Sequence, residues 1–214
     1  MIAARLWTTA FDLAWESFSM GSYGVGGLVA NSEGEVVATG RNLIASPAAG
    51  GDRLGSTPIA HAELNALASL CGLNTGETSV VSTLSPCAMC FAAISVARIP
   101  LVVYAGHDAG SDGILTQPPY AGSTPPSIFH EDLGELSALA ELLPLARSIQ
   151  QRGTDSRPAN VYRTRNAPLL SLAKELAASA QPNLGLGQTP SDALELLRDR
   201  LPPPTIRLVA GLIC

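Results

Sequence analysis

Four residues of this sequence combine zinc-ligating side chains with a carboxylate at close spacing. Glu63 follows His61 by two positions, and the pair Cys87 and Cys90 comes a short way downstream. One imidazole and two thiolates make three zinc ligands and leave a fourth position for water, which is typical of catalytic rather than structural zinc. Such a metal lowers the pKa of its water towards neutrality, and a nearby carboxylate can move the protons. The spacing therefore predicts hydrolysis at zinc, with Glu63 as the proton carrier and not a ligand.

Two helix starts are expected to bring these side chains together. Residues 60–70 predict one helix with His61 in its first turn, and Pro86 is expected to open a second. Cys87 and Cys90 are three apart, so they face the same side of a helix. The free N–H groups and the positive dipole end favour thiolates there. Both helices would thus direct their first turns at one metal.

Other interpretations of the same residues explain fewer of them. A C-x-x-C pair alone also occurs in redox motifs and in halves of zinc knuckles, but these leave His61 and Glu63 without a role. A structural zinc needs a fourth ligand, for which His107 and His130 are candidates. A closed, four-ligand metal therefore stays open as an alternative.

Helical and strand patterns alternate along the first half of the chain. Helices are predicted over residues 3–19, 60–70, 86–97, 131–151, 167–180 and 191–200. Strands are predicted over residues 25–30, 35–39, 79–84 and 101–105. This alternation implies an α/β fold with a partly parallel sheet. A long Gly/Pro/Ser-rich loop is expected over residues 106–127.

These motifs resemble the cytidine deaminase-like superfamily, in the branch of guanine deaminases, tRNA adenosine deaminases and related nucleoside deaminases. The segments that carry the resemblance are residues 26–29, 40–42, 60–67, 83–90 and 97–105. The resemblance covers about residues 5–110 and implies a three-layer α/β/α fold around a mixed central sheet. We therefore expect a zinc-dependent deaminase core in residues 1–115. Residues 116–214 would form a Pro/Gly-rich loop and a mainly helical C-terminal extension packed on that core.

The resemblance also suggests substrate contacts. It implies that Asn42 and the backbone N–H of Ala62 contact the substrate. Ser85 stands where this branch commonly has Glu and is more like some cytidine and deoxycytidylate deaminases; its hydroxyl suits support of the site. His107 and Asp108 directly follow the last core strand, where α/β sheets place ligand-facing loops. We expect substrate contacts there, with a simple turn as the alternative.

Composition favours a small-molecule substrate. The chain of 214 residues has 13 Lys+Arg against 18 Asp+Glu, a net charge of −5. The nearest thing to a basic cluster is Arg152, Arg157, Arg163 and Arg165. Proteins that bind polyanions usually show a basic patch, so nucleic acid is disfavoured as a partner. No Gly-rich phosphate loop is evident, which favours bases and nucleosides over nucleotides.

Location and assembly follow from similar considerations. No apolar run approaches ~20 residues and no signal peptide is visible, so we expect a cytoplasmic protein without a membrane span. The resemblance implies a homodimer. Tyr120 and Phe129 flank a Pro-rich stretch, where an aromatic side chain could stack on a base or simply anchor the loop.

The leading hypothesis is a zinc-dependent hydrolytic deaminase. It would convert an amino-bearing nucleobase, nucleoside or related heterocycle to the keto form and release ammonia. Two alternatives stay open: a tRNA adenosine deaminase that produces inosine, and a non-catalytic, zinc-stabilised protein of the same fold.

Overall fold

The structure, a computed structural model, describes residues 2–70, 75–108, 124–179, 181 and 184–202. Its strands are β1 (Gly26–Ala30), β2 (Val36–Arg41), β3 (Ser79–Leu84), β4 (Leu101–Gly106) and β5 (Ser127–His130). Its helices are α1 (Ala4–Ser19), α2 (Ala62–Ala68), the 3-10 helix η1 (Thr75–Glu77), α3 (Ala88–Val96), α4 (Glu135–Arg152), α5 (Arg157–Arg165), α6 (Ala167–Ala177) and α7 (Pro190–Leu197). No helix among these is long and apolar enough to cross a membrane.

The strands form one mixed sheet in the order β2-β1-β3-β4-β5. β1 runs antiparallel to both β2 and β3, whereas β3, β4 and β5 are parallel to one another. Because parallel strands end at the same edge of a sheet, the segments that follow β3 and β4 leave side by side. The predicted α/β class with a mixed sheet is confirmed.

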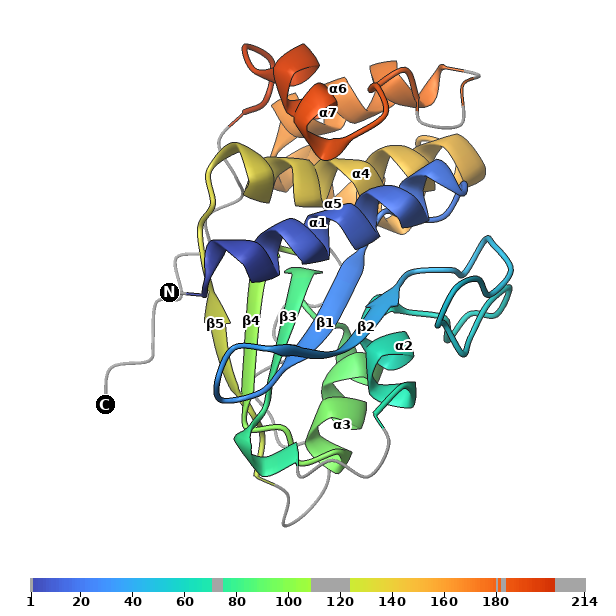
Figure 1. The fold of residues 1–214 in the computed structure, drawn as a ribbon. Coiled ribbons are helices and arrows are strands. Elements are labelled where there is room, and N and C mark those ends of the chain that lie inside the picture. The colour runs from blue at the N-terminus through green and yellow to red at the C-terminus, as the bar shows by residue number, and fades with distance from the viewer. Residues whose placement is uncertain (1, 71–74, 109–123, 180, 182–183, 203–214) are drawn as a thin grey trace.

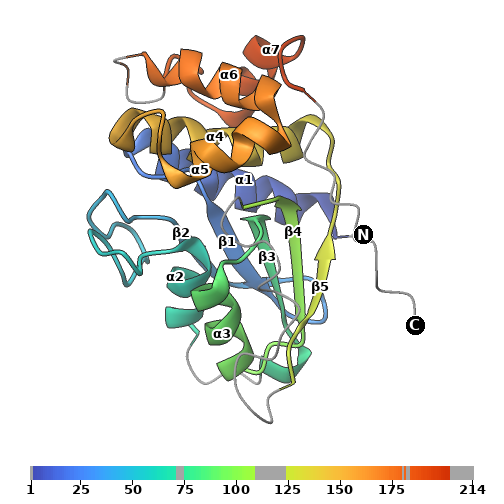
Figure 2. The same cartoon turned by 180° about the vertical axis from the view of Figure 1, so that it is seen from behind.

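Helices cover both faces of this sheet (Figures 1 and 2). Alternate side chains of the strands point to opposite faces, as the strand period of two requires. Val29, Val80 and Val102 pack with residues of α2 and α3. On the other face, Leu28 and Val81 pack with the Trp7 and Phe11 end of α1. This is the predicted three-layer arrangement.

The C-terminal helices build a second hydrophobic core on the outer side of α1 and α4. The leucines of α4 and α6 pack there with Trp15 and Phe18, which belong to α1. The Trp15 indole also donates a hydrogen bond to the carbonyl of Gln188, just before α7. In Figure 1, α6 and α7 lie beyond α4 and α1 as seen from the sheet. Both cores therefore share α1.

Close packing fixes α2 against the sheet. A Cβ on Gly40 would lie 2.3 Å from the carbonyl oxygen of Ala62 and 2.3 Å from the amide nitrogen of Ala66. No side chain can occupy that space, so glycine in β2 lets the helix backbone approach. The approach holds the start of α2, with His61 and Glu63, close to the sheet.

Some predicted boundaries were wrong. The edge strand β5, residues 127–130, was not predicted and begins at the last residue of the predicted loop, and α4 begins at Glu135 instead of residue 131. Helix α5 was missed because only two of its residues, Ala159 and Tyr162, are buried, so it lacks an apolar stripe. β5 was missed because it is short and mostly exposed.

Several expectations fall outside the described residues. They concern most of the predicted loop with Tyr120, the boundary between residues 115 and 116, and the apolar C-terminal residues. The predicted division of the chain into a core and an extension therefore stays a prediction.

Candidate metal centre and the surrounding cavity

The three predicted ligands lie together. The ligand atoms of His61, Cys87 and Cys90 are all within 4.8 Å of one another. Cys87 Sγ lies 3.7 Å from His61 Nδ1 and 3.6 Å from Cys90 Sγ. Tetrahedral zinc with ordinary bond lengths requires S···N and S···S separations of about 3.6 and 3.8 Å. The donor types and their spacing therefore fit zinc.

Two helix N-termini position these ligands. His61 and Cys87 are the N-cap residues of α2 and α3, both with extended backbone. Neither side chain caps its helix, so both are available to the metal. The sequence placed each residue one position inside the helix. For α3 the reason is that Pro86 precedes the N-cap, so the helix begins at Ala88 and not at the proline.

Their surroundings shift the pKa values of the two thiols in opposite directions. The hydrogen bond with Cys90 lowers the pKa of Cys87 to about 4, and the hydrogen bond with His61 adds to this. The same contact with Cys87, together with burial, raises the pKa of Cys90. Burial acts to lower the pKa of His61, but the contact with Cys87 and the charge of Glu63 outweigh it and raise the pKa. One thiolate is thus ready for a cation at neutral pH.

Glu63 lies beside the ligands and is only 4% exposed. Its Oε2 accepts a hydrogen bond from the Cys90 thiol at 3.4 Å, and its Oε1 accepts one from the Ser82 hydroxyl at 3.2 Å. Burial raises the pKa of Glu63 above its ordinary value. A carboxylate with a raised pKa, held on both oxygens next to a metal site, is suited to take up and return a proton.

A cavity of about 450 Å³ opens at the metal centre, within the range of ligand pockets. His61, Glu63 and Cys87 line it. The other predicted site residues that line it are Asn42, Ser85, His107 and Asp108. Ala62 is fully buried and does not line the cavity. The structure thus brings seven of the predicted residues to one cavity, and Cys90 contacts two of them, Cys87 and Glu63.

Two of the predicted substrate contacts also hold the local backbone. Asn42 Oδ1 accepts hydrogen bonds from the Ser22 hydroxyl at 2.9 Å and from the Ile44 N–H at 3.2 Å. The Ser85 hydroxyl accepts the Asp108 N–H at 2.8 Å, which ties the end of β3 to the segment after β4. The Asn42 amide oxygen is therefore occupied by the protein itself, and its NH₂ group is the part suited to a ligand.

Neither of the two candidates for a fourth ligand, His107 and His130, joins the metal-ligand group of the described residues. His107 and His130 stack on each other with ring centroids 4.5 Å apart, and Tyr104 packs against both. His130 Nε2 lies 2.8 Å from the carbonyl of Ala105.

Sequence analysis missed the part of the cavity wall that α4 and α5 supply. These residues are Glu141, Pro144, Leu145, Ser148, Arg152, Arg157, Pro158 and Tyr162, joined by Tyr23 and Val25 near β1. Glu141 was the available signal, because it is a carboxylate inside the apolar stripe of α4 and is 1% exposed. Phe129, by contrast, is 57% exposed on β5 and does not line the cavity.

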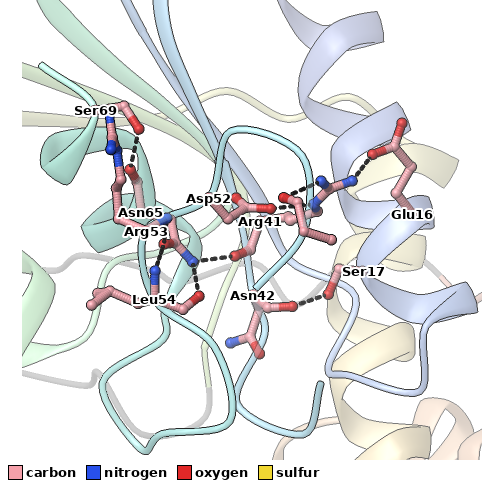
Figure 3. A network of polar contacts seen from close by, with 10 residues as sticks. Glu16, Ser17, Arg41, Asn42, Asp52, Arg53, Leu54, Asn65 and Ser69 are labelled. Carbon is pink, nitrogen blue, oxygen red and sulfur yellow. Dashed lines mark hydrogen bonds and ion pairs between the residues drawn. The ribbon is translucent and has the colours of Figure 1, made fainter. Parts of the chain in front are cut away.

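A polar network holds the long loop before α2 (Figure 3). Arg41 donates to Asp52 at 2.6 Å and to the Ala49 carbonyl at 2.8 Å, and it also pairs with Glu16 on α1. The buried Asn65 side chain bonds four backbone groups, at Arg53 N, Leu54 N, Leu54 O and Arg41 O. These contacts hold the loop between β2 and α2 in place. Two residues of this loop, Ile44 and Pro58, line the cavity.

Known proteins match the first half of the chain. Residues 2–106 match the family described as the cytidine and deoxycytidylate deaminase zinc-binding region. A tRNA(Ile)-lysidine synthase of Deinococcus radiodurans is 37% identical over 110 residues, which make up 49% of this chain and 18% of that protein. The chain therefore spans less than a fifth of the length of that curated relative.

Solved structures share the fold. A structure from a study of A-to-I editing by tRNA:A34 deaminases has a TM-score of 0.50 and 22% identity, and covers 60% of this chain and 98% of its own. The guanine deaminase of Bacillus subtilis has a TM-score of 0.42 and 25% identity, over 59% of this chain and 84% of its own. The first of these likenesses supports the α/β fold described above.

Proposed function

Because the chain belongs to the cytidine deaminase-like superfamily, we propose that it is a zinc-dependent hydrolytic deaminase. It converts an amino-bearing nucleobase, nucleoside or related heterocycle to the keto form. Water supplies the oxygen, the C–N bond to the amino group breaks, and ammonia leaves. The observation that carries this proposal is the position of the Glu63 carboxylate, 3.4 Å from the sulfur of Cys90 and on the wall of the cavity.

His61, Cys87 and Cys90 would hold the zinc ion. When bound, zinc supplies a Lewis acid that lowers the pKa of water at the site. As a zinc ligand Cys90 would be a thiolate, which cannot donate the hydrogen bond to Glu63 Oε2. Oε2 would then be available for proton transfer, while the Ser82 hydroxyl would keep Oε1 in place.

Glu63 carries the protons of the reaction. It takes one from the attacking water and gives one to a ring nitrogen of the heterocycle, and then assists the departure of ammonia. Burial, which raises its pKa, makes the carboxyl a better base at the start and an effective acid later. The hydrogen bond from Ser82 to Oε1 limits the rotations that the side chain must make between these steps.

The remaining predicted contacts are proposals for substrate positioning. The Asn42 NH₂ group can donate to a ring or carbonyl acceptor, and His107 and Asp108 line the same cavity. The Ala62 N–H is proposed as a further donor on the strength of the resemblance. A homodimer and a cytoplasmic location stay predictions, of which light scattering of the purified protein would test the first.

Ammonia release from a substrate panel tests the proposal. The panel contains guanine, adenine and cytosine, their nucleosides and monophosphates, and a tRNA anticodon stem. We expect zinc-loaded wild type to turn over a small molecule and Glu63→Gln to lose about 10²–10⁴-fold in kcat. Glu77→Gln, a substitution at an exposed carboxylate of η1, is the matched control and should retain activity.

Zinc content separates catalysis from folding. Glu63→Gln should bind one zinc ion per chain, as wild type does, because Glu63 is not a ligand. Turnover of the RNA alone would replace the small-molecule proposal with tRNA deamination. Equal turnover by wild type and Glu63→Gln would contradict the role of Glu63. No turnover on the panel with zinc fully bound would favour the non-catalytic alternative.

A further inference from the structure

Two of the arginines in the weak basic cluster of the sequence line the cavity. Arg152 is the last residue of α4 and Arg157 is the first of α5. Both line the same cavity as His61 and Glu63. Figure 2 shows α4 and α5 beside the end of the sheet where β3 and β4 finish. These helices lie outside residues 2–106, the part that matches the deaminase family.

Neither arginine is paired with a carboxylate within the described structure. Arg157 is exposed and makes no hydrogen bond or ion pair there. Arg152 is also exposed, and its guanidinium lies 5.5 Å from the ring centroid of Tyr23, another residue of the cavity wall. Arg163, on the same helix as Arg157, instead pairs with Asp155 at 2.6 Å. The cavity therefore has two positive groups whose charge is not locally compensated.

A buried hydroxyl on the same helix face needs a partner. Ser148 also lines the cavity and precedes Arg152 by four residues, so the two side chains lie one turn apart on α4. Ser148 is 2% exposed, and its Oγ has no hydrogen-bond partner among the described residues. A serine inside a helix usually bonds the carbonyl four residues earlier, which this one does not. A buried polar group without a partner is unfavourable unless a ligand or water satisfies it.

The start of α5 adds to the positive potential. Arg157 and Pro158, its first two residues, both line the cavity. The N-cap residue Ser156 makes no side-chain hydrogen bond to the helix, so the first turn is not capped from within. A helix N-terminus of this kind favours an anion, above all a phosphate.

Two of the three carboxylates of the cavity accept hydrogen bonds from other parts of the protein. Glu63 belongs to the metal centre, and Glu141 accepts hydrogen bonds at both oxygens, from the His107 N–H and the Tyr162 hydroxyl. Asp108 follows β4 and has its backbone bound to Ser85. None of the three forms an ion pair with Arg152 or Arg157.

We propose that Arg152, Arg157 and Ser148 form a subsite for a phosphate group carried by the substrate. This inference rests on the proposed function and narrows its substrate class. The heterocycle that is deaminated belongs to a molecule that also carries a phosphate monoester, such as a nucleoside monophosphate. Two guanidinium groups and a hydroxyl can donate hydrogen bonds to the three terminal oxygens of a phosphate dianion. A carboxylate has only two oxygens to accept them. No Gly-rich loop is required, so the absence of one from the sequence does not argue against nucleotides.

Binding of inorganic phosphate to the zinc-loaded protein tests the subsite without deamination. Titration calorimetry would compare wild type, the double variant Arg152→Ala/Arg157→Ala and the control Arg163→Ala. We expect the double variant to lose about 10-fold or more in affinity and the control to match wild type. Failure of phosphate to bind wild type, or equal binding by the double variant, would overturn the inference. Equally tight binding of acetate would overturn the assignment to phosphate.

Steady-state kinetics tests the same subsite during turnover. For one base, kcat/KM is measured with the nucleoside and with its 5′-monophosphate. We expect the double variant to lose about 10–100-fold with the monophosphate and little with the nucleoside. Deamination of the nucleoside with no preference for the monophosphate would overturn the inference and leave the proposed function intact. Arginine-dependent phosphate binding without any deamination would instead overturn the proposed function alone.

Discussion

The hydroxyl of Tyr162 lies 2.9 Å from Oε2 of Glu141 and 3.1 Å from the carbonyl oxygen of His107. Tyr162 belongs to α5 and Glu141 to α4, while His107 directly follows β4. The other oxygen of Glu141 accepts the His107 N–H at 3.1 Å. Two buried side chains of the C-terminal helices thus hydrogen-bond to the backbone of His107, where the chain leaves β4 and reaches the cavity. We regard both as positioning residues.

Tyr162→Phe should loosen this segment. Loss of the hydroxyl removes a partner from a buried carboxylate, so we expect the free energy of unfolding to fall by about 1–3 kcal/mol. We also expect KM to rise more than kcat falls, since His107 and Asp108 shape the cavity and do not carry the reacting protons. Urea denaturation and steady-state kinetics measure the two effects. Thr164→Ala, at an exposed position of the same helix, is the control.

The pH dependence of stability shows whether Tyr162→Phe acts through the lost hydroxyl or through altered packing. Burial, with the charge of Glu141, raises the pKa of Tyr162 well above its ordinary value. Above about pH 10 the unfolded chain releases the phenol proton and the folded chain keeps it, so this part of the stability falls as pH rises. Tyr162→Phe should show a shallower fall there. Identical slopes for the two proteins would contradict the proposed contact.

Asn65→Ala should release the loop before α2. The side chain of Asn65 is fully buried and satisfies four backbone groups of the loop and of β2. At about 1 kcal/mol for each bond, we expect a loss of roughly 2–4 kcal/mol in the free energy of unfolding. Faster hydrogen exchange at Arg53 and Leu54 would locate the change. Asn160→Ala, at an exposed site, should have little effect, and an equal loss there would refute the interpretation.

Zinc binding should require His61, Cys87 and Cys90 and no other side chain. We expect one zinc ion per chain in wild type and in His130→Gln, and loss of zinc in His61→Ala and Cys87→Ser. Because a metal that binds only the folded state stabilises it, chelation should lower Tm, by an amount that corresponds to about 4 kcal/mol when zinc is at 1,000 times its Kd. Metal analysis and thermal denaturation measure both. Loss of zinc from His130→Gln would instead indicate a closed, four-ligand site.

Much of the fold could be predicted because its first half follows strong local signals. The apolar residues at helical spacing in α1 and the short apolar runs of β3 and β4 indicate directly which residues are buried. The metal ligands were predicted because two short motifs specify their spacing. Edge strand β5 could not be found in this way because it is short and mostly exposed, and helix α5 because only Ala159 and Tyr162 of it are buried.

The cavity wall that α4 and α5 supply could not be predicted from local sequence. Arg152, Arg157 and Ser148 carry no motif, and a cluster of arginines in a sequence usually means a solvated surface. Their proposed role depends on the packing of α4 against β3 and β4, which brings residues more than 80 positions after His61 to the same cavity. Tertiary packing of this kind leaves little trace in local sequence.

The sharing of α1 between two hydrophobic cores has a consequence for synthesis of the protein. Trp15 and Phe18 are synthesised well before their partners in α4, α6 and α7, and the carbonyl that receives the Trp15 indole N–H lies 173 residues later. At ordinary translation speeds this delay is roughly 10–35 s. During it the aromatic end of α1 offers nascent-chain chaperones an uncovered hydrophobic surface, so expression yield should depend on their supply.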